Sequence, residues 1–319
     1  VPADAAGDDR GAEDASVLTR PDARTMTLTI PAPRGLITDR NGKPLAENRV
    51  GYQFALQFAH FPEPIDAEIL TWAEKRLSHA SKLAGKNYEA SEEVVLSHYK
   101  HRRWLPLVFS ASLIAPEKEE TFRKQLIPGL VMHPIYHRHY PGGDSAAHVI
   151  GYVRSKGRLP DGPIVHGELL FEETHGDAGL EKTMDQELTG RSGERQVIFD
   201  SDGRKLRDEL TRRPRIGHTV VTTLDRDWQL HAEKVLEDHC KRGAFVVLDI
   251  PTGELLVLAS RPSYDVNIWV PRISREDLRS LTDDESRPMY GRAFQGLYPP
   301  ASSFKPVVAL TALTQKVVE

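Results

Sequence analysis

A serine and a lysine near the end of the sequence form its clearest candidate for covalent chemistry. Residues 298–306 read YPPASSFKP, and the apolar residues that follow predict a helix with one apolar side. Ser302 and Lys305 are spaced to share one helix face, so the lysine amine can reach the serine oxygen. A neutral amine, its pKa lowered by burial or a neighbouring cation, can accept the serine proton. Ser302 is therefore the candidate nucleophile, and Lys305 is its candidate general base.

The Ser-x-x-Lys spacing alone identifies nothing, because Ser97 and Lys100 repeat it. The copy at Ser302 follows a Pro-Pro pair and opens an apolar helix downstream of an apolar hairpin, whereas the copy at Ser97 lies in a charged stretch. We interpret Ser97 and Lys100 as part of an ordinary surface helix.

Other residues that could bind a metal have simpler interpretations. His133, His137 and His139 have spacing that suits a metal, but no fourth ligand is evident, so we predict no metal site there. Asp225 and Asp227 resemble an acidic metal pair, but an N-cap explains Asp225 better.

Several further residues are assigned structural roles. We expect Cys240 to be a small buried residue rather than a nucleophile. We expect Arg34 and Glu181 to hold the first domain together rather than to contact substrate. Core or interface anchoring is expected of the tryptophans, which are Trp72, Trp104, Trp228 and Trp269.

The composition excludes several classes of protein. The 319 residues include 42 basic and 46 acidic side chains, a net charge of -4, so nucleic acid is not an expected partner. A single cysteine allows no intrachain disulfide. The sequence contains no run of 18 or more apolar residues, so we expect none of its segments to span a bilayer. The chain begins at Val1 rather than Met, which leaves room for a preceding membrane anchor.

Hydrophobic patterning predicts mixed secondary structure in the first two-thirds of the chain. Residues 26–30 and 52–58 alternate as strands do, and Asn41-Gly42 predicts a tight hairpin between them. Spaced apolar residues in the charged region 65–128 indicate helices. Residues 129–215 are again typical of strands and loops.

The later part contains the elements that must position Ser302. Residues 218–224 predict a strand, and Asp225 is expected to cap a helix that runs to about His239. Its apolar face is predicted to hold Trp228, Ala232, Val235 and Leu236. Residues 244–250 and 254–260, joined by a Pro-Thr-Gly turn, predict a hairpin of two largely buried strands.

These patterns predict an α+β protein with a domain boundary near residues 215–217. We divide the chain into a disordered tail or linker over 1–25, a first domain over 26–215 and a second domain over 216–319.

In addition, several motifs keep the order found in a known family. They are PRGLITDRNG (33–42), RHYPGG (138–143), AHVIGYV (147–153), GLE (179–181), LTG (188–190) with Gly193, SRPSYDVN (260–267) and GLYPP (296–300). With the Ser302 motif, they resemble the class B penicillin-binding proteins, and most of all the elongation-type subgroup known as penicillin-binding protein 2.

The resemblance implies an elongated, noncatalytic pedestal of the dimerisation type, followed by the first part of a transpeptidase domain, outside the cytoplasmic membrane. Ser302 would attack the D-Ala–D-Ala end of a peptidoglycan stem peptide, with Lys305 as base, and an amine from a second stem peptide would resolve the acyl-enzyme. β-Lactams would acylate the same serine. The implied partner is a membrane glycosyltransferase, and no metal or organic cofactor is implied.

The sequence departs from the family pattern in two places. The family has Gly before the nucleophile, whereas this chain has Ala301. Ala would cost about 1 kcal/mol if this position needs a positive φ and nothing otherwise, and we expect the change to be harmless. The family's Ser-x-Asn and Lys-Thr-Gly motifs have no counterpart before Glu319, so we expect a truncated, nearly inactive chain.

Two alternatives to the transpeptidase therefore stay open. One is a pedestal that acts as a binding module. The other is a β-lactam sensor or serine β-lactamase, which the long pedestal disfavours.

Overall fold

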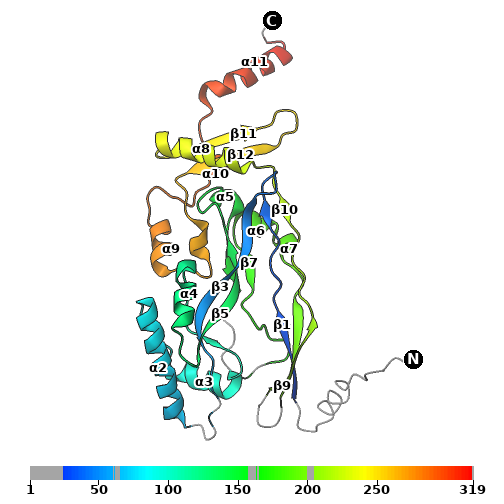
Figure 1. The fold of residues 1–319 in the computed structure, drawn as a ribbon. Coiled ribbons are helices and arrows are strands. Elements are labelled where there is room, and N and C mark those ends of the chain that lie inside the picture. The colour runs from blue at the N-terminus through cyan, green and yellow to red at the C-terminus, as the bar shows by residue number, and fades with distance from the viewer. Residues whose placement is uncertain are drawn as a thin grey trace, which may run out of the picture.

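The computed structural model describes residues 24–59, 61, 65–156, 163, 165–199 and 205–317. The tail predicted over 1–25 lies outside these ranges except for its last two residues. The described chain forms an elongated molecule with two arms below a central body and a small helix-on-sheet layer above (Figure 1).

The first arm is a long hairpin capped by helices. β3 (Pro44–Leu56) pairs antiparallel with β5 (Leu130–His139), and β4 (Leu107–Val108) pairs with the end of β3. The helices are α2 (Asp66–Ala84), α3 (Glu92–Arg102) and α4 (Pro116–Lys124), as the charged region 65–128 predicts. Phe54 is fully buried among aromatic rings from this arm, including Phe109 and Phe122.

The second arm is a three-stranded antiparallel sheet in the order β1-β8-β9. Its strands are β1 (Arg24–Ile30), β8 (Gly193–Phe199) and β9 (Lys205–Arg212). The strand predicted at 26–30 is therefore confirmed. Leu28 and Val197 are buried at its centre, whereas the edge strand β9 is charged, which discourages pairing with other chains.

The central body joins both arms. It contains β2 (Ile37–Thr38), α5 (Ala147–Ile150), β6 (Val153–Ser155), β7 (Thr174–Gly176), α6 (Gly179–Thr183), α7 (Asp185–Leu188) and β10 (Val220–Val221). The predicted Asn41-Gly42 turn joins β2 to β3, and Gly42 has a φ of 80°, a value that glycine adopts without strain. The strand predicted at 218–224 is much shorter than expected. The hydrophobic core of the central body includes residues from both sides of the predicted boundary at 215–217, such as Ile37, Tyr140 and Trp269.

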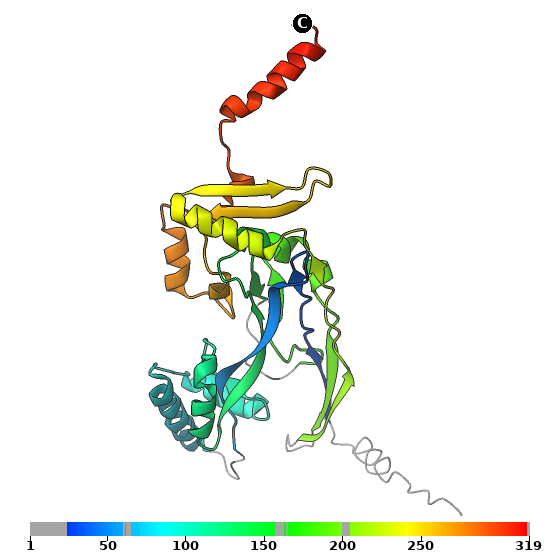
Figure 2. The same ribbon diagram turned by 45° about the horizontal axis from the view of Figure 1, so that its top comes forward.

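The upper layer places α8 (Arg226–His239) on the antiparallel pair β11 (Gly243–Leu248) and β12 (Leu255–Arg261). The chain then continues through η1 (Val266–Trp269), α9 (Arg275–Thr282), α10 (Arg292–Gln295), η2 (Ala301–Phe304) and α11 (Lys305–Thr314). Figure 2 shows α11 extending away from the sheet at the C-terminal end of the chain.

Three expectations about this layer are wrong. β12 is largely buried under α8, but β11 is mostly exposed because no further strand covers it in the described chain. Trp228 is 55% exposed, because α8 buries Gln229, Ala232 and Glu233 instead. Cys240 is exposed, because it follows the last residue of α8 at the surface.

No helix among the described residues is both long and apolar enough to cross a membrane.

Candidate active site and the joint that supports it

Ser302 lies on a short helical turn that leads into α11. It belongs to η2, and the N–H of Lys305, the first residue of α11, donates to the Ser302 carbonyl. Both side chains are exposed, and neither forms a hydrogen bond or ion pair within the described chain. The predicted helix is thus confirmed, while the contact between the two side chains stays a prediction.

Ala301 adopts a backbone conformation that disfavours its side chain. Its φ is 45°, in the left-handed region, so the expectation that Ala is harmless here is wrong. An L-residue with a Cβ in this conformation costs about 1–2 kcal/mol relative to glycine. The residue before the candidate nucleophile therefore holds local strain.

The apolar side of α11 is uncovered. Its larger residues are all at least half exposed: Val307, Val308, Leu310 and Leu313. The Ser97 copy of the motif lies on a helix that is packed against the rest of the protein. This helix is α3, whose Val95 and Tyr99 are buried in the hydrophobic core of the first arm. The interpretation of Ser97 and Lys100 as part of an ordinary helix is confirmed.

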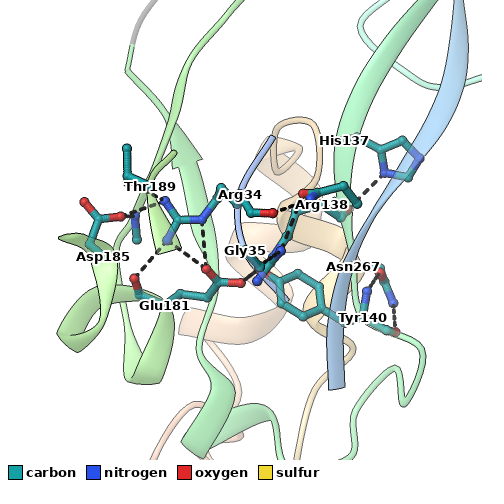
Figure 3. A network of polar contacts seen from close by, with 11 residues as sticks. Arg34, Gly35, His137, Arg138, Tyr140, Glu181, Asp185, Thr189 and Asn267 are labelled. Carbon is teal, nitrogen blue, oxygen red and sulfur yellow. Dashed lines mark hydrogen bonds and ion pairs between the residues drawn. The ribbon is translucent and has the colours of Figure 1, made fainter. Parts of the chain in front are cut away.

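A buried ion-pair network lies at the centre of the body (Figure 3). The Glu181 carboxylate is completely buried and accepts from Arg34 Nε at 3.1 Å and from Arg138 Nε at 2.6 Å. Arg138 Nη1 also donates to the Gly35 carbonyl at 2.7 Å. Three segments far apart in sequence therefore converge on one carboxylate, which confirms the structural role expected of Arg34 and Glu181.

Asp185 and Tyr140 extend this network. Arg34 Nη1 donates to Asp185 Oδ1 at 2.7 Å. Burial opposes ionisation of Asp185, but the Gly176 N–H and Arg34 outweigh it and hold the pKa of this carboxyl below its ordinary value. The Tyr140 hydroxyl donates to Glu181 at 3.4 Å, and burial next to this carboxylate raises the pKa of Tyr140 well above its usual range.

The turn at residues 39–43 connects the body to α8. The buried Asp39 carboxylate accepts from the backbone N–H groups of Asn41 at 2.9 Å, Lys43 at 2.8 Å and Arg226 at 3.1 Å. Asp225 caps α8 by accepting from the N–H groups of Asp227 and Trp228, as predicted, and the bond from Trp228 lowers the pKa of Asp225. This turn therefore fixes the N-terminal end of α8 on the pedestal.

A second connection is the joint loop, residues 140–146. Asn267 clamps the Tyr140 backbone, accepting its N–H at 2.9 Å and donating to its carbonyl at 3.0 Å. Arg261 pairs with Asp144 at 2.5 Å. Together these contacts fix the segment after β12 to the pedestal.

The buried Glu233 of α8 makes the third contact with the joint loop. It accepts the Ala146 N–H at 2.8 Å, and burial raises the pKa of Glu233. The sequence analysis missed this role of Glu233, as well as those of Asp144 and Asn267. A charged residue on the otherwise apolar face of a predicted helix was the available signal for Glu233.

The three histidines proposed as a metal alternative lie on β5. Their alternate spacing places them on one side of the strand, where burial lowers the pKa of His133, His137 and His139. Within the ranges that the structure describes, no three His, Cys, Asp or Glu side chains are grouped as a metal site requires.

Comparison with known proteins identifies the family. The Penicillin-binding Protein dimerisation domain matches residues 29–222. The chain belongs to the penicillin-binding proteins that carry this domain. The Penicillin binding protein transpeptidase domain then matches residues 243–319, so a pedestal is followed by the start of a transpeptidase domain.

Similar proteins point to one subgroup. The peptidoglycan D,D-transpeptidase MrdA of Escherichia coli is 34% identical over 94% of this chain and 47% of its own length, and MrdA of Haemophilus influenzae is 31% identical over 92% and 44%. The chain thus spans about half the length of these curated relatives. The resemblance to class B, elongation-type members is confirmed.

Solved structures agree with the fold. The penicillin-binding protein PBP2 of Helicobacter pylori, in complex with MreC, aligns with a TM-score of 0.66 at 27% identity over 91% of this chain and 53% of that one. A peptidoglycan synthase complex that coordinates polymerization and crosslinking aligns with a TM-score of 0.65 at 26% identity, over 98% and 52%.

Proposed function

We propose that this chain is the pedestal and nucleophile-bearing part of a peptidoglycan D,D-transpeptidase that works through a serine acyl-enzyme. The observation that carries the proposal is Ser302 on the turn that opens α11, inside the segment that matches the transpeptidase domain. The curated relatives are named for this activity.

The proposed reaction is an acyl transfer in two steps. Lys305 takes the Ser302 proton while Oγ attacks the penultimate D-Ala carbonyl of a stem peptide, and terminal D-Ala leaves with a proton on its amine. An amine of a second stem peptide then attacks the ester, forming the crosslink and returning the proton to Ser302. Lys305 can take this proton only as the neutral amine. A β-lactam would stop after the first step, because its ring-opened product stays bound to Ser302.

We propose that the 319-residue chain by itself reacts poorly. Ser302 and Lys305 are exposed, and no described residue donates to the Ser302 side chain. An acyl transfer of this kind depends on a preorganised, water-poor oxyanion site, and loss of a single donor costs about 10²–10³ in rate.

Labelling with a fluorescent penicillin tests the nucleophile. In the protein expressed from its complete gene, Ser302→Ala should abolish labelling. The matched control Ser303→Ala changes the adjacent serine and should keep most of it. Labelling that persists in the Ser302→Ala variant would contradict the assignment of Ser302 as the nucleophile.

A second function, protein binding by the pedestal, is favoured by the structure that the described part of the pedestal forms. Its ion-pair network and both arms are formed in the described chain. Two similar structures are complexes, one with MreC and one a peptidoglycan synthase. We propose that the pedestal contacts a membrane glycosyltransferase at the outer face of the cytoplasmic membrane. The chain should co-purify with that enzyme in detergent, and failure to do so would count against this role.

A further inference from the structure

We propose that a groove between the C-terminal end of α7 and the segment before β10 binds a carboxylate of a peptide between Arg191 and Arg215. By its chemistry, this peptide is the peptidoglycan stem peptide, an assignment that rests on the proposed function. The groove is separate from Ser302 and is lined by residues 186–187, 189–191 and 215–218.

The two arginines face each other across a backbone pairing. Arg191 donates its N–H to the Arg215 carbonyl at 2.9 Å, and Arg215 donates back at 2.8 Å. Residues paired in this way point their side chains to the same face, with Cβ atoms about 5 Å apart. Two like charges placed there repel each other, so the pair lowers stability unless an anion lies between the charges.

No carboxylate of the described chain neutralises them. Neither guanidinium has an ion pair within the described ranges, and both residues are exposed. Of the neighbouring carboxylates, Glu194 pairs with Arg212 at 2.8 Å, and Glu187, which also lines the groove, contacts His218 at 3.2 Å. Both cations are therefore available to a ligand.

The groove has a volume of about 380 Å³, within the range of small-ligand sites. A Cβ on Gly190 would lie 2.1 Å from the Arg215 carbonyl oxygen, and one on Gly217 would lie 1.9 Å from that of Leu188. Only glycine fits at these two positions, which lets the two segments that line the groove approach each other closely.

The chemistry of the lining favours a peptide carboxylate. Guanidinium groups bind a carboxylate through paired, charge-assisted hydrogen bonds. The 66% exposed Ile216 offers an apolar contact for a small side chain such as alanine, and Gln186 can bond a peptide group.

Calorimetric titration of the 319-residue chain with a synthetic stem pentapeptide tests the proposal. Arg191→Gln and Arg215→Gln should each weaken binding at least fivefold. Arg213→Gln, a matched change at an exposed arginine outside the groove lining, should change it less than twofold. A peptide whose carboxylates are amidated should bind at least tenfold more weakly. Arg215→Gln should also raise the melting temperature by roughly 1–3 °C, because it removes the like-charge repulsion.

Unchanged affinity in the Arg191→Gln/Arg215→Gln double variant would overturn the proposal. Equal affinity for inorganic phosphate would replace it with a general anion site. The titration is independent of catalysis, because Ser302→Ala should bind the peptide normally while losing penicillin labelling. Failure of the groove and failure of the nucleophile assignment therefore give different results.

Discussion

Glu181 shows how a single buried charge holds the pedestal together. Its carboxylate is fully buried and pairs with Arg34 at 3.0 Å and with Arg138 at 2.6 Å. Removal of one partner from a buried ion pair leaves uncompensated charge and costs about 3–5 kcal/mol. Glu181→Gln should therefore lower the free energy of unfolding by about that amount in urea denaturation. The control Glu120→Gln breaks an exposed pair with Lys124 and should cost less than about 0.5 kcal/mol. Similar losses in the two variants would contradict the role given to Glu181.

Ala301 lies directly before the proposed nucleophile, so we expect its backbone conformation to affect reactivity. With a φ of 45°, this position suits glycine and excludes β-branched residues. We expect Ala301→Gly to keep or raise the rate of penicillin acylation in the protein expressed from its complete gene. Ala301→Val should reduce the rate at least tenfold. Ser303→Val, a matched change where φ is not positive, should have a smaller effect. Equal rates for Ala301→Val and the parent would show that the left-handed turn is not needed.

At the scale of elements, the joint loop decides how β12 and the segment after it sit on the pedestal. Asn267 makes two hydrogen bonds to the Tyr140 backbone. Their loss leaves a buried peptide group partly unsatisfied, which costs about 1–3 kcal/mol. Asn267→Ala should lower the melting temperature by several degrees, whereas Asn87→Ala, which removes an exposed contact with Glu89, should leave it nearly unchanged. Equal melting temperatures would exclude a clamp at Asn267.

The sheet of the first arm should respond to acid. Burial lowers the pKa of His133, His137 and His139, so the unfolded chain, with histidine pKa values near 6.5, binds more protons. Stability should therefore fall as the pH drops below about 6.5. The raised pKa of Glu233 acts in the opposite sense, because the folded state then takes up a proton more readily.

Urea denaturation at pH 7.5 and pH 5 measures this balance. The loss of stability on acidification should be smaller in His137→Gln and larger in Glu233→Gln than in the parent chain. The same loss in all three proteins would contradict both assignments.

At the scale of the whole molecule, the sequence predicts the parts better than their contacts. Periodicity and turn residues locate α2 to α4, the hairpin at Asn41-Gly42 and the helix capped by Asp225, because these signals are local. The exposure of Trp228 and of β11 depends on what covers them, which no local pattern encodes. The same holds for Glu233 and the joint loop, which lie far apart in sequence.

The candidate active site shows the same difference between local and long-range features. The motif predicts Ser302 and Lys305 as a pair, and the helix that they open is present. The strain at Ala301 could not be predicted, since it depends on a dihedral angle set by the path of the chain between α10 and α11.

The central claim is that Ser302 forms the acyl-enzyme, and mass spectrometry of the penicillin-treated protein from the complete gene tests it most directly. Trypsin should release residues 293–316 as one peptide, because Lys305 is followed by Pro306 and that bond resists cleavage. The account predicts a single penicilloyl adduct on this peptide, which fragmentation places on Ser302. An adduct on Ser303, or on any peptide outside residues 293–316, would contradict it.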